Sequence, residues 1–199
     1  MNTFDELGLQ DNILKAIKEL GFETPMPVQE AVIPRIIENT TDIVALAQTG
    51  TGKTAAFGLP LLQLIDPDNK KTQALILSPT RELCMQIASD LNNYSKYLPN
   101  IKVTAVYGGA SIETQAKQIK TGTQIISATP GRTLDMIMRK YADLSEVRFL
   151  VLDEADEMLD MGFEEDVQSI IESTPRIAIR SCSRPLCRQM WKRLPAGTW

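Results

Sequence analysis

Five short runs of apolar residues stand out along the chain, each followed by a longer stretch in which apolar residues recur every three or four positions. The short runs show almost no alternation of apolar and polar residues. This is typical of strands that are buried on both faces, as in a parallel sheet covered by helices on each side. The pattern therefore predicts an α/β fold with a parallel β-sheet. The predicted strands are Ile43–Leu46, Ala74–Leu77, Val103–Tyr107, Gln124–Ser127 and Phe149–Leu152.

The intervening stretches have the period of amphipathic helices. A helix is predicted from about Asp11 to Leu20, because apolar residues share one side and Gly21 follows as a stop signal. Two further helices follow the second and fifth strands and present one apolar face each. Those faces consist of Leu83, Ile87, Leu91 and Tyr94, and of Val167, Ile170 and Ile171.

Composition narrows the class of protein. The chain has 199 residues, of which 43% are hydrophobic, enough for one globular domain with its own core. No run approaches the roughly 18 apolar residues of a membrane span, and the first ten residues carry acids where a signal peptide carries basic residues. We therefore expect a cytoplasmic protein without a membrane partner. The chain has three cysteines and no histidine, so acid-base chemistry has to rest on carboxylates, lysines or water.

Charge is distributed unevenly. Residues 176–199 contain six basic residues, no acidic residue, two of the three cysteines and both tryptophans. Residues 1–175 contain 15 basic and 25 acidic residues. An acidic body does not attract nucleic acid over its whole surface, although a local basic groove remains open as an alternative.

A phosphate-binding loop follows the first predicted strand and leads into helical sequence. Its two glycines allow backbone N–H groups to approach an anion closely, and the helix N-terminus adds its dipole. The lysine can reach the β- and γ-phosphates of a nucleotide, and the last hydroxyl can hold Mg²⁺. The alternative is a glycine-rich turn with a surface lysine, which the strand-loop-helix order disfavours. The loop consists of Ala47, Gln48, Thr49, Gly50, Thr51, Gly52, Lys53 and Thr54.

An acidic tetrad, Asp153 to Asp156, follows the fifth predicted strand. Asp153 is placed to hold Mg²⁺ through a water molecule, and Glu154 can polarise the water that attacks the γ-phosphate. Acidic residues also favour the first turn of a solvated helix, so the tetrad alone is ambiguous. Its position after a buried strand and downstream of a phosphate loop favours catalysis by Lys53, Asp153 and Glu154.

With these two motifs in one chain, residues 1 to about 175 resemble the N-terminal RecA-like domain of DEAD-box ATP-dependent RNA helicases. The resemblance implies a RecA-like P-loop NTPase fold, ATP and Mg²⁺ as cofactors, ATP hydrolysis, and RNA as the partner. It also implies a Q-motif region at residues 1–32 and a RecA-like ATP-binding domain at residues 33–175.

The Q motif of the family selects adenine. Here Phe4, Phe22 and Gln29 match it, with Gln29 expected to bind the adenine edge and Phe22 to stack on the base. Met26 stands where the family usually has Thr or Ser, so a hydroxyl contact to the phosphate loop is missing. From the residues alone, a loop bordered by prolines is the alternative interpretation.

Three further segments resemble motifs that bind the RNA backbone in the family. Each follows a predicted strand and offers N–H groups, hydroxyls or an arginine, which suits phosphate contacts without base recognition. Individually each is also an ordinary strand-to-helix turn, with Ser111 and Pro130 as helix-start signals, and Arg132 is equally suited to a structural ion pair. The candidate RNA-binding residues are Pro79, Thr80, Arg81, Gly108, Gly109, Thr129, Pro130, Gly131 and Arg132.

The likeness stops after Pro175, where the family continues with a strand ending in Ser-Ala-Thr and a second RecA-like domain. Allowed codons for residues 176–199, read in the neighbouring frame after one inserted G, spell ENRNTLLFSATMPADVEAIASRYM. We interpret residues 176–199 as an out-of-frame tail, so that the chain is a truncated helicase. An authentic basic extension is the alternative. Without the family's strand, two strand edges would open at the sheet centre unless Ile177–Cys182 takes its place.

Three functions follow as hypotheses. The first is the ATP- and RNA-binding part of a helicase that turns over ATP poorly by itself, because the family's arginine fingers lie in the second domain. The second is a non-catalytic nucleotide- or RNA-binding module whose basic tail adds salt-dependent affinity. The third, an unrelated P-loop enzyme, is disfavoured by the Q-motif residues and the acidic tetrad.

Overall fold

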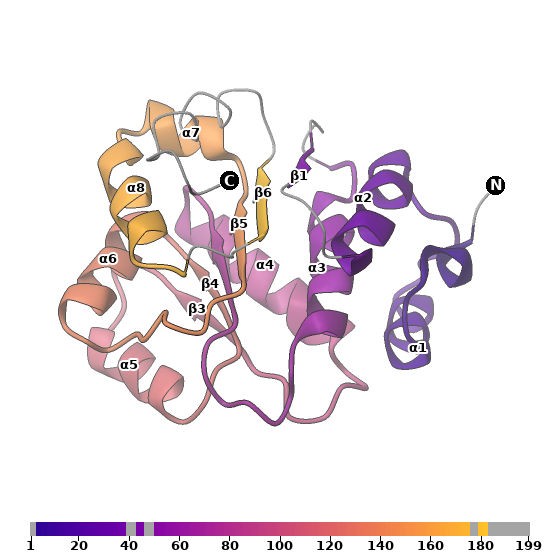
Figure 1. Ribbon diagram of the computed structural model, residues 1–199, viewed down its shortest axis with the longest axis horizontal. Helices are drawn as coiled ribbons and strands as arrows, with labels where there is room; N and C mark the ends of the chain where they lie inside the picture. Colours follow the sequence, from indigo (N-terminus) through magenta and orange to yellow (C-terminus); the bar gives the residue numbers. More distant parts are fainter. Residues whose placement is uncertain (1–2, 39–42, 46–49, 176–178, 183–199) are drawn as a thin grey trace.

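A computed structural model describes residues 3–38, 43–45, 50–175 and 179–182 (Figure 1). Within these residues the strands form one parallel sheet in the order β1-β6-β5-β2-β4-β3. The sheet order differs from the chain order, so residues from distant parts of the sequence meet at its edges. The strands are β1 (Ile43–Val44), β2 (Ala74–Leu77), β3 (Val103–Val106), β4 (Ile125–Ala128), β5 (Phe149–Leu152) and β6 (Ile179–Cys182).

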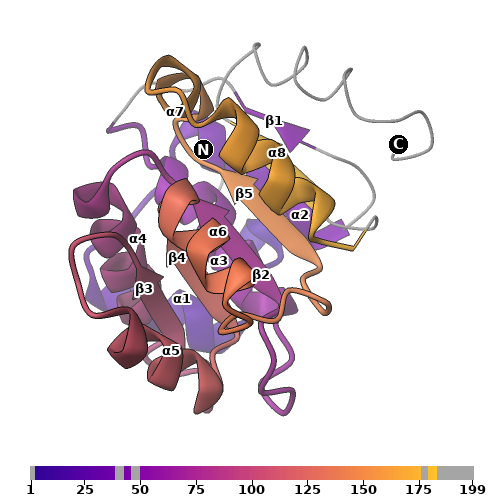
Figure 2. The ribbon, with the colours of Figure 1, turned by 90° about the vertical axis from the view of Figure 1, so that its left-hand side faces the viewer.

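Helices cover both faces of the sheet. Figure 1 shows α1, α2 and α3 on one side and α6 and α8 on the other, and Figure 2 shows α6 and α8 in front of the strands. The helical elements are η1 (Phe4–Leu7), α1 (Asp11–Glu19), α2 (Pro27–Glu38), α3 (Lys53–Leu64), α4 (Arg81–Tyr94), α5 (Ile112–Lys120), α6 (Pro130–Met138), α7 (Ala155–Asp160) and α8 (Glu164–Glu172).

Two hydrophobic cores flank the sheet, and successive residues of β2 and of β5 alternate between them. In β2, Ile76 packs into the core that includes α1 to α4, whereas Leu75 and Leu77 pack into the core that includes α5 to α8. All four residues of β2 are buried, as expected for a strand covered on both faces. The predicted α/β fold is confirmed.

The ends of the predicted elements agree closely with the structure. β2 and β5 have the predicted bounds, β3 ends one residue earlier than predicted, and β4 is shifted by one residue at both ends. Ser111 caps α5 by accepting a hydrogen bond from the Thr114 N–H, and Pro130 opens α6, so both predicted helix starts are confirmed. The first predicted strand, Ile43–Leu46, is longer than β1, because Ala45 lies outside the strand; Leu46 lies outside the described residues.

Helix α2 was not predicted from the sequence. It begins at Pro27 and contains Pro34, and a proline inside a helix removes a backbone hydrogen bond. The alternative interpretation of this region, a loop bordered by prolines, is wrong for residues 27–38, which form the helix. Burial of Val32, Ile33 and Ile36 in the core with α3 outweighs this local cost.

The backbone of residues 179–182 occupies the gap that the sequence left at the sheet centre. β6 pairs with β1 on one side and with β5 on the other, in parallel. The prediction that residues 177–182 replace the missing strand is thus confirmed for the backbone of four of them. No helix within the described part of the chain is long and apolar enough to cross a membrane.

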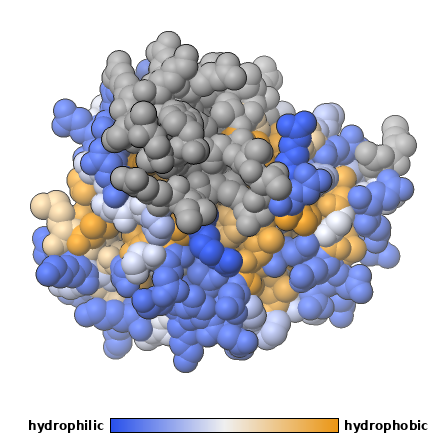
Figure 3. All heavy atoms as spheres, in the orientation of Figure 1, coloured by the Kyte–Doolittle hydropathy of each residue, from blue (hydrophilic) through white to orange (hydrophobic). Residues whose placement is uncertain are grey.

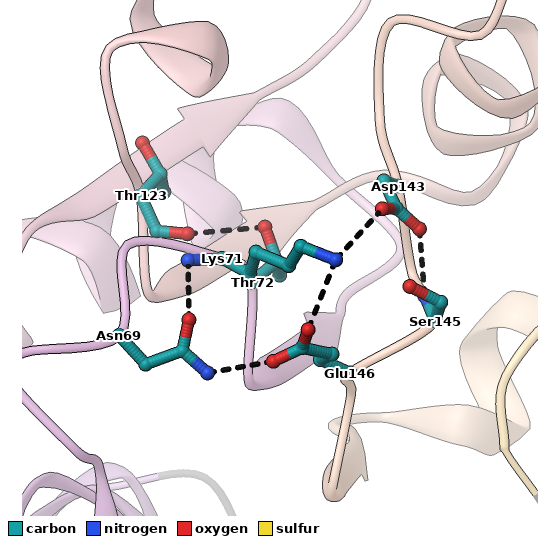
Figure 4. A network of polar contacts seen from close by, with 7 residues as sticks. All are labelled: Asn69, Lys71, Thr72, Thr123, Asp143, Ser145 and Glu146. Carbon is teal, nitrogen blue, oxygen red and sulfur yellow. Dashed lines mark hydrogen bonds and ion pairs between the residues drawn. The ribbon is translucent and has the colours of Figure 1, made fainter.

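The amino-terminal edge of the sheet is a polar surface, with hydrophilic side chains along the lower side of the molecule (Figure 3). Lys71 forms ion pairs with Glu146 (2.9 Å) and Asp143 (3.7 Å), and Asn69 donates a hydrogen bond to Glu146 (2.6 Å) (Figure 4). These contacts tie the loop after α3 to the loop before β5. They lie at the edge opposite the predicted nucleotide site.

Candidate active site

The predicted phosphate lysine and the first acidic residue of the tetrad meet at the carboxyl edge of the sheet. Lys53 is the first residue of α3, and Asp153 directly follows β5. The Lys53 Nζ lies 3.8 Å from the Asp153 Oδ1. Asp153 is only 4% exposed, and this burial raises the pKa of its carboxyl group, while the Lys53 charge opposes the shift. The pair brings together residues separated by most of the domain.

The glycines of the phosphate loop are required by its backbone shape. Gly50 and Gly52 have φ angles of 82° and 78°, in the left-handed region that favours glycine. A Cβ atom on Gly52 would also collide with the Gln29 Nε2. Thr51 and Thr54 are half-buried beside them. The remaining predicted loop residues, Ala47, Gln48 and Thr49, lie outside the described residues.

Gln29 connects the Q-motif region to the phosphate loop. Its Oε1 accepts a hydrogen bond from the Met26 N–H (2.8 Å), and its Nε2 donates to the Gly52 carbonyl (3.1 Å). The side chain is 2% exposed. The contact to the loop that the family assigns to a hydroxyl at position 26 is thus supplied here by the Gln29 amide. Adenine recognition by Gln29 stays a prediction.

The two predicted aromatic residues lie in one cluster with a third. The Phe22 ring centroid is 5.9 Å from that of Phe4 and 5.9 Å from that of Tyr94. Phe4 is buried in the core, so its ring supports Phe22 from behind. Tyr94 comes from the end of α4, and no sequence signal near the Q motif pointed to it.

Glu154 holds an unusual backbone conformation at the start of α7. Its φ of 51° and ψ of 46° place a non-glycine residue in the left-handed region, which costs about 1–2 kcal/mol. A hydrogen bond between Glu154 and Glu157 raises the pKa of the Glu157 carboxyl. Glu154 directly follows Asp153 in the chain, so its backbone lies at the carboxyl end of β5.

The predicted RNA-contacting residues follow β2, β4 and β3, which are neighbours in the sheet. The Arg81 guanidinium lies over the Tyr107 ring, 4.9 Å from its centroid, and beside the exposed Gly109. Thr80 caps α4 by accepting a hydrogen bond from the Leu83 N–H. Gly108 is also exposed, whereas Pro79 is buried.

Arg132 has a structural role in this arrangement. Its Nη1 donates hydrogen bonds to the Ala110 carbonyl (3.0 Å) and to the Gln115 Oε1 (2.9 Å). These acceptors are neutral, so the ion pair considered as an alternative is replaced by hydrogen bonds that join α6 to the start of α5. The other residues of that segment are the half-buried Thr129, the buried Pro130 and the exposed Gly131.

Comparison with known proteins agrees with this geometry. Residues 26–189 match the family described as DEAD/DEAH box helicase. The chain belongs to this family. It is 49% identical over 173 residues to the ATP-dependent RNA helicase DeaD of Haemophilus influenzae, covering 87% of this chain and 28% of that protein. It is 51% identical over 172 residues to the ATP-dependent RNA helicase CshA of Limosilactobacillus reuteri, covering 86% and 34%.

A solved structure shows the same fold. A DEAD box protein from the hyperthermophile Methanococcus jannaschii superimposes with a TM-score of 0.89 at 41% identity, over 98% of this chain and 54% of that one. The predicted RecA-like fold of the DEAD-box family is therefore confirmed. The chain spans about a third of the length of the two curated relatives described above.

The residues of this DEAD-box chain fit ATP and Mg²⁺. Three features meet at the start of α3. The helix N-terminus supplies the positive end of its dipole, Lys53 supplies a positive charge, and the Thr54 hydroxyl supplies an oxygen ligand. Mg²⁺ is usually bound by one or two carboxylates together with water and phosphate oxygens, so the single buried Asp153 is a suitable donor. Among the described residues, no group of three acidic, cysteine or histidine side chains forms a protein-only metal site.

Proposed function

We propose that this chain binds ATP with Mg²⁺ at the carboxyl edge of its sheet and forms the ATP-binding part of an ATP-dependent RNA helicase. The observation that carries the proposal is the Lys53–Asp153 pair, whose side chains lie 3.8 Å apart at the start of α3 and the end of β5. Membership of the DEAD/DEAH box helicase family and the names of the relatives support it.

Each side chain of the site has its own role in binding the nucleotide or in its hydrolysis. Lys53 binds the β- and γ-phosphates, Thr54 and Asp153 hold the metal site, with Asp153 acting through water, and Glu154 accepts a proton from the attacking water. Mg²⁺ held by these residues would supply positive charge that neutralises the phosphate oxygens. Gln29 and Phe22 select the adenine base. The hydrogen bond from the Gln29 amide to the Gly52 carbonyl would couple base binding to the phosphate loop.

RNA binds along the neighbouring strand ends in this proposal. Helices α4 and α6 both start at the carboxyl edge, after Thr80 and Thr129, and their N-terminal N–H groups suit phosphate oxygens. The exposed Arg81 adds a charge beside Gly108 and Gly109. Such contacts bind the RNA backbone and do not distinguish between base sequences.

Duplex unwinding belongs to the parent protein in this proposal. The chain corresponds to 28% of one relative and 34% of another. The family resemblance places the arginine fingers in a second RecA-like domain, and such arginines contribute factors of about 10³ to 10⁵ in related systems. We therefore expect the chain to bind nucleotide but to hydrolyse ATP slowly, without strong stimulation by RNA.

A binding experiment tests the nucleotide site. Titration of the chain with a fluorescent ADP analogue in Mg²⁺ should give saturable binding, and Lys53→Ala should weaken it about 100-fold through loss of charge-assisted bonds. Lys71→Ala is the matched control, because Lys71 lies at the opposite edge of the sheet and pairs with Glu146. Equal affinities of all three proteins would refute the proposed site.

RNA binding is tested separately. Arg81→Ala should weaken binding of single-stranded RNA and lower the slope of log affinity against log salt by about 1. Arg139→Ala is the control, since Arg139 follows the far end of α6 and pairs with Asp135 (2.7 Å). A loss that is equal in both variants would argue for unspecific charge attraction instead.

We also propose that residues 176–199 are translated out of frame and that the protein is cytoplasmic. The change in composition after Pro175 and the meaningful neighbouring frame support the first part. The family match reaches residue 189, so an authentic extension is the competing hypothesis. Sequencing the coding DNA across residues 170–199 decides between them, because only a frameshift continues in the neighbouring frame into a second RecA-like domain.

A further inference from the structure

One buried hydroxyl group lacks a hydrogen-bond partner among the described residues. The Ser78 side chain is 0% exposed, and its Oγ is the single buried side-chain nitrogen or oxygen of this part of the chain without a partner. A buried polar group without a partner is unfavourable and rare in folded proteins. Ser78 therefore calls for an explanation.

The hydrogen bonds of the sheet place Ser78 beside Asp153. The ladder continues one residue past β2, because the Ser78 N–H donates to the Ala128 carbonyl (3.0 Å) and the Asp153 N–H donates to the Leu77 carbonyl (2.9 Å). Leu77 and Leu152 are partners in the register of β2 and β5, so the next residues, Ser78 and Asp153, are partners as well.

Both side chains belong to the same face of the sheet. Successive strand residues alternate between faces, so Ser78 shares a face with Ile76, and Asp153 shares it with Val151. Ile76 and Val151 pack in the core that also contains the first turns of α3. Ser78 thus lies on the side of the sheet that carries Lys53, next to the carboxylate that Lys53 approaches.

This placement suggests that Ser78 gains a hydrogen-bond partner only when nucleotide is bound. Without nucleotide, the Lys53 ammonium is the charged neighbour of Asp153. When Lys53 binds phosphate oxygens, the Asp153 carboxylate loses that neighbour and can accept another hydrogen bond. A serine hydroxyl can rotate to donate without moving the backbone.

We propose that Ser78 is a positioning residue for the metal-bound site: its hydroxyl donates to the Asp153 carboxylate when Lys53 turns to the nucleotide, and so orients that carboxylate toward the Mg²⁺-bound water. This inference rests on the proposed nucleotide site. It assigns Ser78 a role in the Mg²⁺-dependent part of nucleotide affinity and none in the stability of the nucleotide-free chain.

The test compares Ser78→Ala with Ser127→Ala in the full chain. Ser127 is equally buried on the adjacent strand, but its Oγ already donates to the Cys84 carbonyl (2.9 Å). Affinity for the fluorescent ADP analogue is measured in Mg²⁺ and in EDTA, and the melting temperature is measured without nucleotide. Ser78→Ala should weaken binding about tenfold in Mg²⁺, leave binding in EDTA unchanged, and leave the melting temperature unchanged or higher.

Ser127→Ala should show the reverse pattern, with a lower melting temperature and a wild-type ratio of the two affinities. The proposal is overturned if Ser78→Ala keeps the wild-type ratio, or if it lowers the melting temperature as much as Ser127→Ala does. If the wild-type chain binds no nucleotide, or if Lys53→Ala binds as tightly as wild type, the proposed function fails and this inference with it. A normal Lys53 effect without a Ser78 effect removes only the inference.

Discussion

The two parts of the sheet differ in how firmly they are built. In the order β5-β2-β4-β3, four strands of four residues pair along their full length, and β2, β4 and β5 are buried throughout. In the other part, β1 has two residues and, within the described part of the chain, pairs with β6 alone, which comes from the basic segment. The acidic tetrad follows the first part, whereas the phosphate loop follows the second.

The described end of the phosphate loop, Gly50 to Thr54, leads into a helix that is held firmly in the core. All residues of α3 from Ala55 to Leu62 are buried, and the helix packs closely along α2. Gln29 of α2 adds a hydrogen bond to Gly52 at the start of α3. A short strand suffices where the following helix is held on several sides.

The largest expected effect is on the free energy of unfolding, and it is tested with one variant in each part of the sheet. Ile76→Ala in β2 should lower the free energy of unfolding by about 3–5 kcal/mol, because Ile76 is 0% exposed at the centre of the sheet. Ile43→Ala in β1 should cost less, about 1–2 kcal/mol, since neighbours of a short strand can relax into the space. Urea unfolding measures both. Equal losses would show that β1 is as tightly integrated as β2.

A second prediction concerns β6. Arg180 is the register partner of the buried Leu150, and central parallel strands are usually apolar. Arg180→Val should therefore raise the free energy of unfolding by about 1–3 kcal/mol. Arg139→Val on the surface is the control and should change it by no more than about 0.5 kcal/mol. If Arg180→Val gives no gain, β6 contributes little to the stability of the part of the sheet formed by β1 and β6.

A third prediction tests the packing around Phe22 through pH. Burial, with a smaller contribution from Asp90, raises the pKa of Tyr94 from 10.0 to about 12. The folded state therefore holds this proton more tightly than the unfolded state, and the resulting stability is complete below pH 10 and is lost as the pH rises to about 12. Tyr94→Phe should reduce the alkaline loss by about 2 kcal/mol in urea unfolding. An unchanged pH profile would indicate an accessible phenol.

The smallest effect is expected at the polar edge. Lys71 and its partners Asp143 and Glu146 are exposed, and exposed ion pairs contribute little because water screens them. Lys71→Ala should leave the melting temperature unchanged within error, at low and high salt. A clear decrease in melting temperature would mean that the loops at this edge stabilise the part of the sheet formed by β5, β2, β4 and β3.

Much of the fold was predictable because its signals are local. The strands Ala74–Leu77 and Phe149–Leu152 follow from uninterrupted apolar runs, and the starts of α5 and α6 follow from Ser111 and Pro130. Helix α2 was not predictable in this way, because Pro34 opposes a helix locally and only burial against α3 supports it. On α4, Cys84 lies on the buried face three residues before Ile87, whereas Leu83, which was predicted for that face, is half-buried.

The sequence by itself determined the motifs of the site: the glycines and Lys53 of the phosphate loop, Gln29, and the Asp153–Glu154 pair. Tertiary structure alone decided which residues meet there. Gln29 contacts Gly52, Tyr94 packs on Phe22, and Ser78 lies beside Asp153. The physical reason is that the order of strands in the sheet departs from their order in the chain, so that long-range burial and hydrogen bonding, which leave no local periodicity, select the neighbours.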